Sequence, residues 1–250
     1  MFFFLISCTQ QKSTSEQDTS VPDESRYCEP TQSLEKRILY GHVGDLNTSD
    51  SNIPTGTEAN ALTGVSITNC NTGQTVFSDA EGNWTIDVPE QEFVTFQVHF
   101  DGYIESRWTI DPHHDGTGPD IKDKYSNTIA TSDFLDEIFE ASGHIWDKNN
   151  SIIVVDVVNP NLNDPITGPD LIGSVVTLQS PHEIALVVDD EERFLIEGNT
   201  LSQNSDVIFL NVEPGELFFD IVTPDDSICS YPQNRWTKAN EIFHLSVYCY

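Results

Sequence analysis

The sequence predicts a mainly β protein, built from two tandem β-sandwich modules that are joined by a short helix. Three observations support this fold class. Apolar and polar residues alternate in several short runs, turn signals rich in Gly, Pro, Asn and Asp separate these runs, and one stretch changes to helical spacing. The chain has 250 residues, of which 37% are hydrophobic, and this is enough for two modest cores.

The clearest alternation lies in the first half of the chain. Val65 and Ile67 alternate with serine and threonine, and residues 84–88 and 94–100 alternate in the same way. Turn residues at 71–73 and 79–83 separate the runs, because Gly adopts positive φ and Asn or Asp bonds its own backbone. The segment therefore predicts hairpins with one buried and one solvated face.

Five motifs of this half resemble, in the same order, the carboxypeptidase regulatory-like domain. They are Gly41-His42-Val43, Leu62-Thr63-Gly64-Val65-Ser66-Ile67, Ser78-Asp79-Ala80-Glu81-Gly82-Asn83-Trp84, Val88-Pro89 and Gly102-Tyr103. The resemblance covers residues 38–110 and implies a transthyretin-like or Ig-like β-sandwich. It also implies a non-catalytic role, since this domain is typically an accessory to peptidases, glycan-active proteins, transporters and adhesive surface proteins.

The composition of the remaining chain indicates three segments: a tether, a linker and a second module. Residues 9–37 are rich in Ser, Thr, Gln, Glu and Asp and predict a disordered tether. Residues 111–143 predict a polar linker with one short helix, in which apolar residues of 134–139 fall at helical spacing after Thr131 or Ser132 as N-cap. Residues 144–250 predict a second, divergent β-sandwich.

The second module repeats the first in outline. Residues 151–158 are apolar on both faces and predict a central strand, and residues 171–178 echo residues 62–68. Residues 206–222 resemble the closing hairpin of the same family, with Pro214 and Gly215 at its turn. The acidic run at 189–192 predicts a solvated hairpin tip.

The N-terminus resembles a bacterial lipoprotein signal. Residues 1–8 are a short apolar run that closes on Leu5-Ile6-Ser7-Cys8, and this pattern implies lipidation of Cys8 after cleavage. The run has no basic residues and is shorter than a usual signal, which a start codon further upstream would explain. The alternative is an ordinary thiol in an irregular N-terminus. The resemblance implies an exported protein held by lipid at the outer membrane or cell surface of a bacterium.

Four further cysteines indicate an oxidising compartment. An even number of cysteines outside the signal permits three connectivities, and sequence neighbourhood favours Cys28–Cys70 and Cys229–Cys249. Cys249 continues the apolar face of residues 243–247 and is expected to point into the second core. The spacings match neither a zinc ribbon nor a Cys-x-x-Cys redox pair.

The formal net charge of -30 comes from 41 acidic and 11 basic residues. Such a field repels phosphate backbones and anionic lipids, so it argues against nucleic-acid binding and against electrostatic membrane contact. We expect a solvated acidic exterior, with a lipid anchor as the only membrane attachment.

Candidate metal ligands are few. Asp111, His113, His114 and Asp115 gather on one loop, but adjacent histidines lack the spacing of a catalytic zinc site. Two other loops hold oxygen ligands of the kind that calcium takes, and these are Asp45, Asn47 and Asp50, and Asn161, Asn163, Asp164 and Asp170. The alternative for both loops is solvated turn residues. No cofactor is predicted beyond this structural calcium.

These observations predict a non-catalytic cell-envelope lipoprotein that acts as a structural, adhesive or protein-binding adaptor, with an envelope protein or a glycan as partner. One alternative is a carbohydrate-binding module, in which Trp84, Trp108 or Trp236 would stack on sugars, although Trp84 alternates in phase with a core strand. A second alternative is a metal-assisted hydrolase that uses His113 and His114. No serine lies in a Gly-x-Ser-x-Gly elbow.

Overall fold

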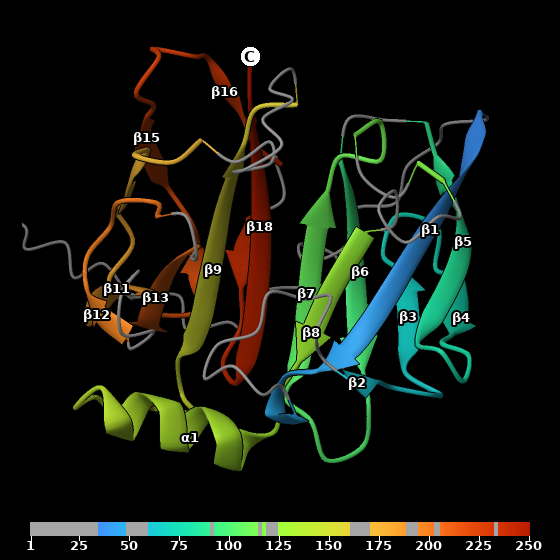
Figure 1. The fold of residues 1–250 in the computed structure, drawn as a ribbon, viewed down its shortest axis with the longest axis horizontal. Coiled ribbons are helices and arrows are strands. Elements are labelled where there is room, and N and C mark those ends of the chain that lie inside the picture. The colour runs from blue at the N-terminus through green and yellow to red at the C-terminus, as the bar shows by residue number, and fades with distance from the viewer. Residues whose placement is uncertain are drawn as a thin grey trace, which may run out of the picture.

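The computed structural model describes residues 35–48, 60–90, 93–114, 117–118, 125–160, 171–188, 195–202, 206–232 and 235–250. Within these residues the protein is mainly β with one α-helix (Figure 1), as the sequence predicts. The described helix is too short to cross a membrane.

The first half of the chain forms two facing sheets. Its elements are β1 (Lys36–Asp45), the 3-10 turn η2 (Leu46–Thr48), β2 (Asn60–Ala61), β3 (Ser66–Asn69), β4 (Thr75–Phe77), β5 (Asn83–Pro89), β6 (Val94–His99), β7 (Glu105–Ile110) and β8 (Tyr125–Ile129). One sheet has the order β2-β1-β5, with β8 also paired to β1, and the other contains β4, β3, β6 and β7. A core that includes Trp84, Phe96 and Trp108 fills the space between them.

The second half adds α1 (Ser132–Ala141), β9 (Ser151–Val158), β10 (Val175–Leu178), β11 (Ile184–Val188), β12 (Leu195–Glu197), β13 (Val207–Val212), β14 (Gly215–Glu216), β15 (Phe219–Val222), β16 (Cys229–Ser230), β17 (Trp236–Thr237) and β18 (Glu241–Cys249). Here β9 lies between β13 and β18, so the prediction of a central strand is confirmed. Ile153 and Val155 enter one core cluster and Ile152 enters another, because successive side chains point to opposite faces.

The two halves share one sheet. β18 pairs in parallel with both β9 and β7, from Glu241↔Glu105 to Leu245↔Thr109 on the β7 side. The result is a sheet of ten described strands that runs from β12 to β4. Figure 1 shows β18 standing between β9 and β7, with α1 near one end of β9. The sequence predicts only the helical connection between the modules, and this backbone pairing adds a second one.

The short helix forms where its spacing predicts it. Thr131 is the N-cap, and its side chain accepts a hydrogen bond from the Phe134 amide at 3.4 Å. Leu135 and Phe139 are buried on the face that packs on the sheet, and Asp133 lies in the first turn. The chain leaves the helix through Gly143 at positive φ.

Two expectations about connections need correction. The polar segment 111–143 is more than a linker, because β8 lies in it and pairs in parallel with β1. The hairpin expected over residues 206–222 is wrong, because β13 pairs with β9 and β11 whereas β15 pairs with β10 in a separate sheet.

Asn211 gives the physical reason for the second correction. It has a φ of 56°, and the β13 register shifts between Phe209 and Val212. Its side chain accepts a hydrogen bond from the Asp147 amide at 2.7 Å and donates to the Ile145 carbonyl at 2.8 Å. The bulge shifts the register so that Val212 still pairs with Ser151 of β9, and the chain beyond it forms β14, which pairs with β17 instead of turning back on β13.

Candidate functional site

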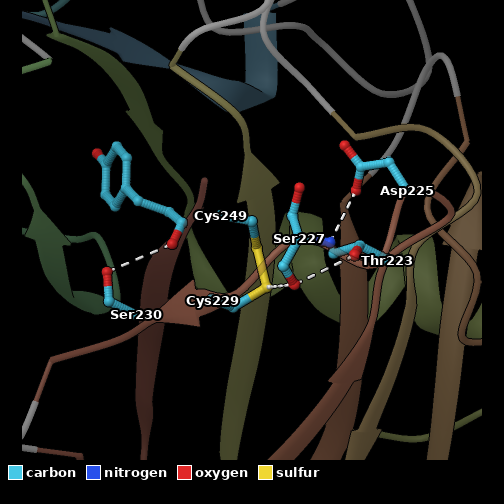
Figure 2. Close-up of a disulfide and its surroundings, with 7 residues drawn as sticks. Thr223, Asp225, Ser227, Cys229, Ser230 and Cys249 are labelled. Atoms are coloured by element: carbon cyan, nitrogen blue, oxygen red, sulfur yellow. Dashed lines mark hydrogen bonds between the residues drawn. A yellow bond between two sulfur atoms is a disulfide. The ribbon is translucent and has the colours of Figure 1, made fainter.

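The structure describes Cys70, Cys229 and Cys249, but not Cys28, among the four cysteines that are predicted to form disulfides. Cys229 and Cys249 form a disulfide between the adjacent strands β16 and β18 (Figure 2). Cys249 lies in the core cluster of the second module, on the face that the sequence predicts. Cys70 is disulfide-bonded, whereas Cys28, its predicted partner, and Cys8, the predicted lipidation site, lie outside the described residues.

Two residues of the first calcium candidate, Asp45 and Asn47, form hydrogen bonds within the protein. The Asp45 carboxylate accepts a hydrogen bond from the Asn47 amide at 3.0 Å, and burial together with the Asp45 charge raises the pKa of Tyr103 to about 12. The Asn47 side-chain oxygen accepts from the amide and hydroxyl of Thr131, at 3.2 and 3.3 Å. These groups therefore tie the end of β1 to the start of α1. The remaining calcium candidates lie outside the described residues, and they are Asp50, Asn161, Asn163, Asp164 and Asp170.

The histidine loop has local partners. The His113 amide and its Nδ1 approach Asp111 Oδ1 at 2.8 and 2.9 Å. The His114 Nε2 contacts the Tyr250 hydroxyl at 3.0 Å, and its ring stacks on Tyr248 with centroids 5.7 Å apart. Asp115 is not described, and no three His, Cys, Asp or Glu side chains gather into a metal-binding group in the described part of the chain. The arrangement fastens this loop to the end of β18.

The predicted sugar-stacking residues are also placed. Trp84 and Trp108 are buried in the first core, with exposed fractions of 3% and 0%, so neither ring can receive a sugar. Trp236 is half-buried on β17, and its carbonyl accepts a hydrogen bond from Arg107. Trp84 and Trp108 therefore belong to the core of the first half of the chain.

The contact that the sequence does not reveal is a buried ion pair at the junction of the modules. Arg107 on β7 donates from Nη2 to Glu241 Oε1 on β18 at 3.0 Å, and their side chains are only 4% and 1% exposed. The guanidinium lies 4.0 Å from the centre of the Phe243 ring. Glu241 Oε1 also accepts hydrogen bonds from the Thr237 hydroxyl at 2.9 Å and from the Lys238 backbone amide at 2.8 Å.

A second pair continues the junction toward solvent. Lys238 donates to Glu105 at 2.5 Å, and Gln97 donates to the same carboxylate. Burial works against the charge of Glu105, but the hydrogen bonds from Lys238 and Gln97 hold its pKa below the ordinary value. Residues 236–238 of the second module thus contact two side chains of the first module: the Trp236 carbonyl accepts from Arg107, and the Lys238 side chain donates to Glu105.

The signal for this junction in the sequence is weak. Arg107 is one of only 11 basic residues, and it stands inside a strand. Its partner lies 134 positions away, so neither alternation nor spacing can link the two.

Comparisons with known proteins are distant. The sequence matches no protein-family model and no curated protein. Among solved structures, the Bacillus anthracis TIE protein matches 86% of this chain at 14% identity and a TM-score of 0.24, and the match spans about a third (34%) of that protein. The minor pilin GBS52 of Streptococcus agalactiae matches 84% of this chain and 95% of its own, at 10% identity and a TM-score of 0.23.

A third similar structure is a single-residue mutant of the shaft pilin SpaA of Lactobacillus rhamnosus GG. It matches 86% of this chain and 98% of its own, at 11% identity and a TM-score of 0.25. These likenesses are too distant to carry a functional argument. The resemblance of residues 38–110 to the carboxypeptidase regulatory-like domain stays a prediction.

Proposed function

We propose that this chain is a non-catalytic cell-envelope lipoprotein, in which two β modules act as one rigid structural, adhesive or protein-binding unit. The observation that carries the proposal is the junction, where β7 pairs with β18 and Arg107 pairs with Glu241. A hinge would serve a protein that closes on a substrate. A continuous sheet with a buried ion pair instead fixes the angle between two surfaces.

The chemistry of the junction supports rigidity. Separating the modules would leave a guanidinium and a carboxylate without their partners, and breaking such a buried pair costs about 3–5 kcal/mol. The backbone pairing of β7 with β18 would be lost at the same time. Relative motion of the modules is therefore disfavoured, whereas domains joined by small polar interfaces usually move.

Export is the second part of the proposal. The Cys229–Cys249 disulfide suits an oxidising compartment. The lipoprotein-like residues Leu5-Ile6-Ser7-Cys8 and the polar segment that follows them would hold the rigid unit away from a membrane. The partner would be an envelope protein or a glycan.

Mass spectrometry of protein taken from the native cell envelope tests this proposal. We expect a diacyl or triacyl mass on Cys8, together with peptides that are cross-linked through Cys229 and Cys249. A Cys8→Ser variant should leave the membrane fraction while retaining the disulfide. An unmodified Cys8 with free thiols at Cys229 and Cys249, in protein that stays in the cytosol, would refute the proposal.

A further inference from the structure

The ten-stranded sheet ends at β4, which pairs with β3 and with no other described strand (Figure 1). The Asn69 amide donates to the Gln74 carbonyl at 2.8 Å, so this pair of the β3–β4 ladder is hydrogen-bonded. Bonded and non-bonded pairs alternate in an antiparallel ladder, and Val76 therefore belongs to the next bonded pair. The backbone N–H and C=O groups of Thr75 and Phe77 point away from β3, toward the open edge of the sheet.

Phe77 is an unusual side chain for an open edge. It is 66% exposed and shares the solvated face of β4 with Thr75, whose hydroxyl lies 2.8 Å from that of Thr68 on β3. Val76 points to the opposite face and packs against the first core. Open edges are commonly protected by lysine, proline or a bulge, and β4 has none of these. The protection that remains is its length of 3 residues.

The charges around β4 have one sign. Residues 38–106 contain no Lys or Arg, whereas Asp and Glu recur throughout this range. Asp79 and Glu81, in the turn that follows β4, are exposed. Such a surface attracts a cationic partner and repels an anionic one, both during approach and after contact.

We propose that β4 binds an extended, positively charged segment of a partner protein, which joins the sheet as an additional strand. The backbone of the segment pairs with the outward groups of Thr75 and Phe77. The residue opposite Val76 is apolar, because it extends the first core. A Lys or Arg opposite Phe77 packs its stem and its charge against the exposed ring, close to the surrounding carboxylates.

This docking edge rests on the proposed protein-binding function and specifies the class of the partner. A second copy of the chain is a poor occupant, because it brings two acidic β4 regions together. A glycan lacks the regular backbone amides that pair with an open strand. Since only Thr75 and Phe77 direct backbone groups outward, the affinity depends strongly on the exposed ring and on charge.

The experiment adds a short peptide of alternating lysine and valine to the purified full chain and follows the backbone amides by nuclear magnetic resonance. At saturating peptide, hydrogen exchange at the Thr75 and Phe77 amides should slow about tenfold, whereas Val76, already bonded to β3, should change little. A peptide of alternating glutamate and valine should bind about tenfold more weakly, because the acidic surface repels it.

Two variants separate the contact with Phe77 from a general effect. Phe77→Ser should lower the affinity for the lysine–valine peptide about fivefold, since it removes the ring and leaves the β3–β4 ladder intact. Ile196→Ser is the matched control. Ile196 is 44% exposed on β12, at the opposite edge of the same sheet, and its replacement should leave binding unchanged.

Unchanged exchange at Thr75 and Phe77 in the presence of the lysine–valine peptide would overturn the proposal. Equal affinities for the two peptides, or an unchanged affinity in Phe77→Ser, would also overturn it. Protection of both amides before any peptide is added, in a chain that sediments as a dimer, would make a second copy the occupant instead. The peptides are added to purified protein, so these results do not depend on the anchor at Cys8, which mass spectrometry tests separately.

Discussion

Trp84 packs across Gly41, its partner on the neighbouring strand β1, and this contact shapes the first core. A Cβ atom on residue 41 would lie 2.0 Å from the indole ring. The turn that leads into Trp84 is equally specific, because Asp79 Oδ1 accepts from the amides of Glu81 and Asn83 at 3.0 and 2.8 Å. Gly82 in this turn has a φ of 73°, and a Cβ there would meet the Val43 carbonyl at 2.6 Å. The motifs at 41–43 and 78–84 thus have a physical basis in this fold.

Gly41→Ala should lower the free energy of unfolding by about 3 kcal/mol, because the new methyl group overlaps a ring that cannot move away within a packed core. Urea unfolding of the natural chain and the variant measures this change. Gly64→Ala is the control, since Gly64 has positive φ but no atom within 4 Å of its Cβ position, and it should cost only about 1 kcal/mol. Equal losses at the two positions would contradict the account of the Trp84 contact.

His244 makes stability depend on pH. Its pKa is about 4 in the folded protein, against 6.5 as its ordinary value, so the unfolded chain binds the proton more readily. The free energy of unfolding is therefore unaffected above about pH 7 and falls as the pH drops through 6.5 toward 4, by on the order of 2–3 kcal/mol.

Chemical unfolding at several pH values, compared with His244→Leu, isolates this effect from the carboxylates. The variant should lose the part of the pH dependence that lies between about pH 4 and 6.5. His99→Leu should retain it, because the His99 side chain is 62% exposed. Parallel profiles for the natural chain and His244→Leu would contradict the assignment.

At the scale of elements, the sequence predicts what local patterns determine. The helix over 132–141 follows from apolar residues at helical spacing after an N-cap, and β9 follows from an unbroken apolar run. β8 escapes prediction because only Thr128 and Ile129 of its five residues are buried, and pairing with β1 stabilises it instead. The hairpin predicted from β13 and β15 does not form, and the chain between these strands is irregular at Asn211. The side-chain partners of Asn211 lie 28 to 66 positions away, so no local pattern reveals them.

The disulfide fastens the short β16 to the end of β18. It closes a loop with a sequence separation of 20, so removing it should lower the free energy of unfolding by about 3 kcal/mol. The double variant Cys229→Ala with Cys249→Ala should show this loss as a lower melting temperature. A reducing agent would not isolate the effect, because Cys70 is also disulfide-bonded. A double variant that melts at the natural temperature would contradict this role.

At the scale of the whole molecule, the parallel pairing of β7 and β18 makes two modules into one sheet. The candidate site at this junction could not be predicted, because it depends on residues that meet only after both modules have folded. Arg107 and Glu241 lie in different halves of the chain. In the sequence each is a single charged residue in a predicted β-strand, and nothing nearby points to the other. Sequence patterns describe each module well and say little about the surface between them.

Glu241→Gln should lower the free energy of unfolding by about 3 kcal/mol, because it removes the carboxylate charge that pairs with the buried Arg107 guanidinium. Glu105→Gln breaks the neighbouring pair, whose side chains are 35% and 30% exposed, and should cost about 1 kcal/mol or less. Urea unfolding of the two variants gives the comparison. A larger loss for Glu105→Gln would place the junction's stability at its rim and contradict the account.

Hydrogen exchange in increasing urea, read separately for peptides from β5 and from β9, tests most directly whether the two modules form one rigid unit. If they do, both strands should lose protection at the same urea concentration in the natural chain, and Glu241→Gln should lower both midpoints together. Separate midpoints for β5 and β9 in the natural chain would show that the two modules unfold independently and do not form one rigid unit.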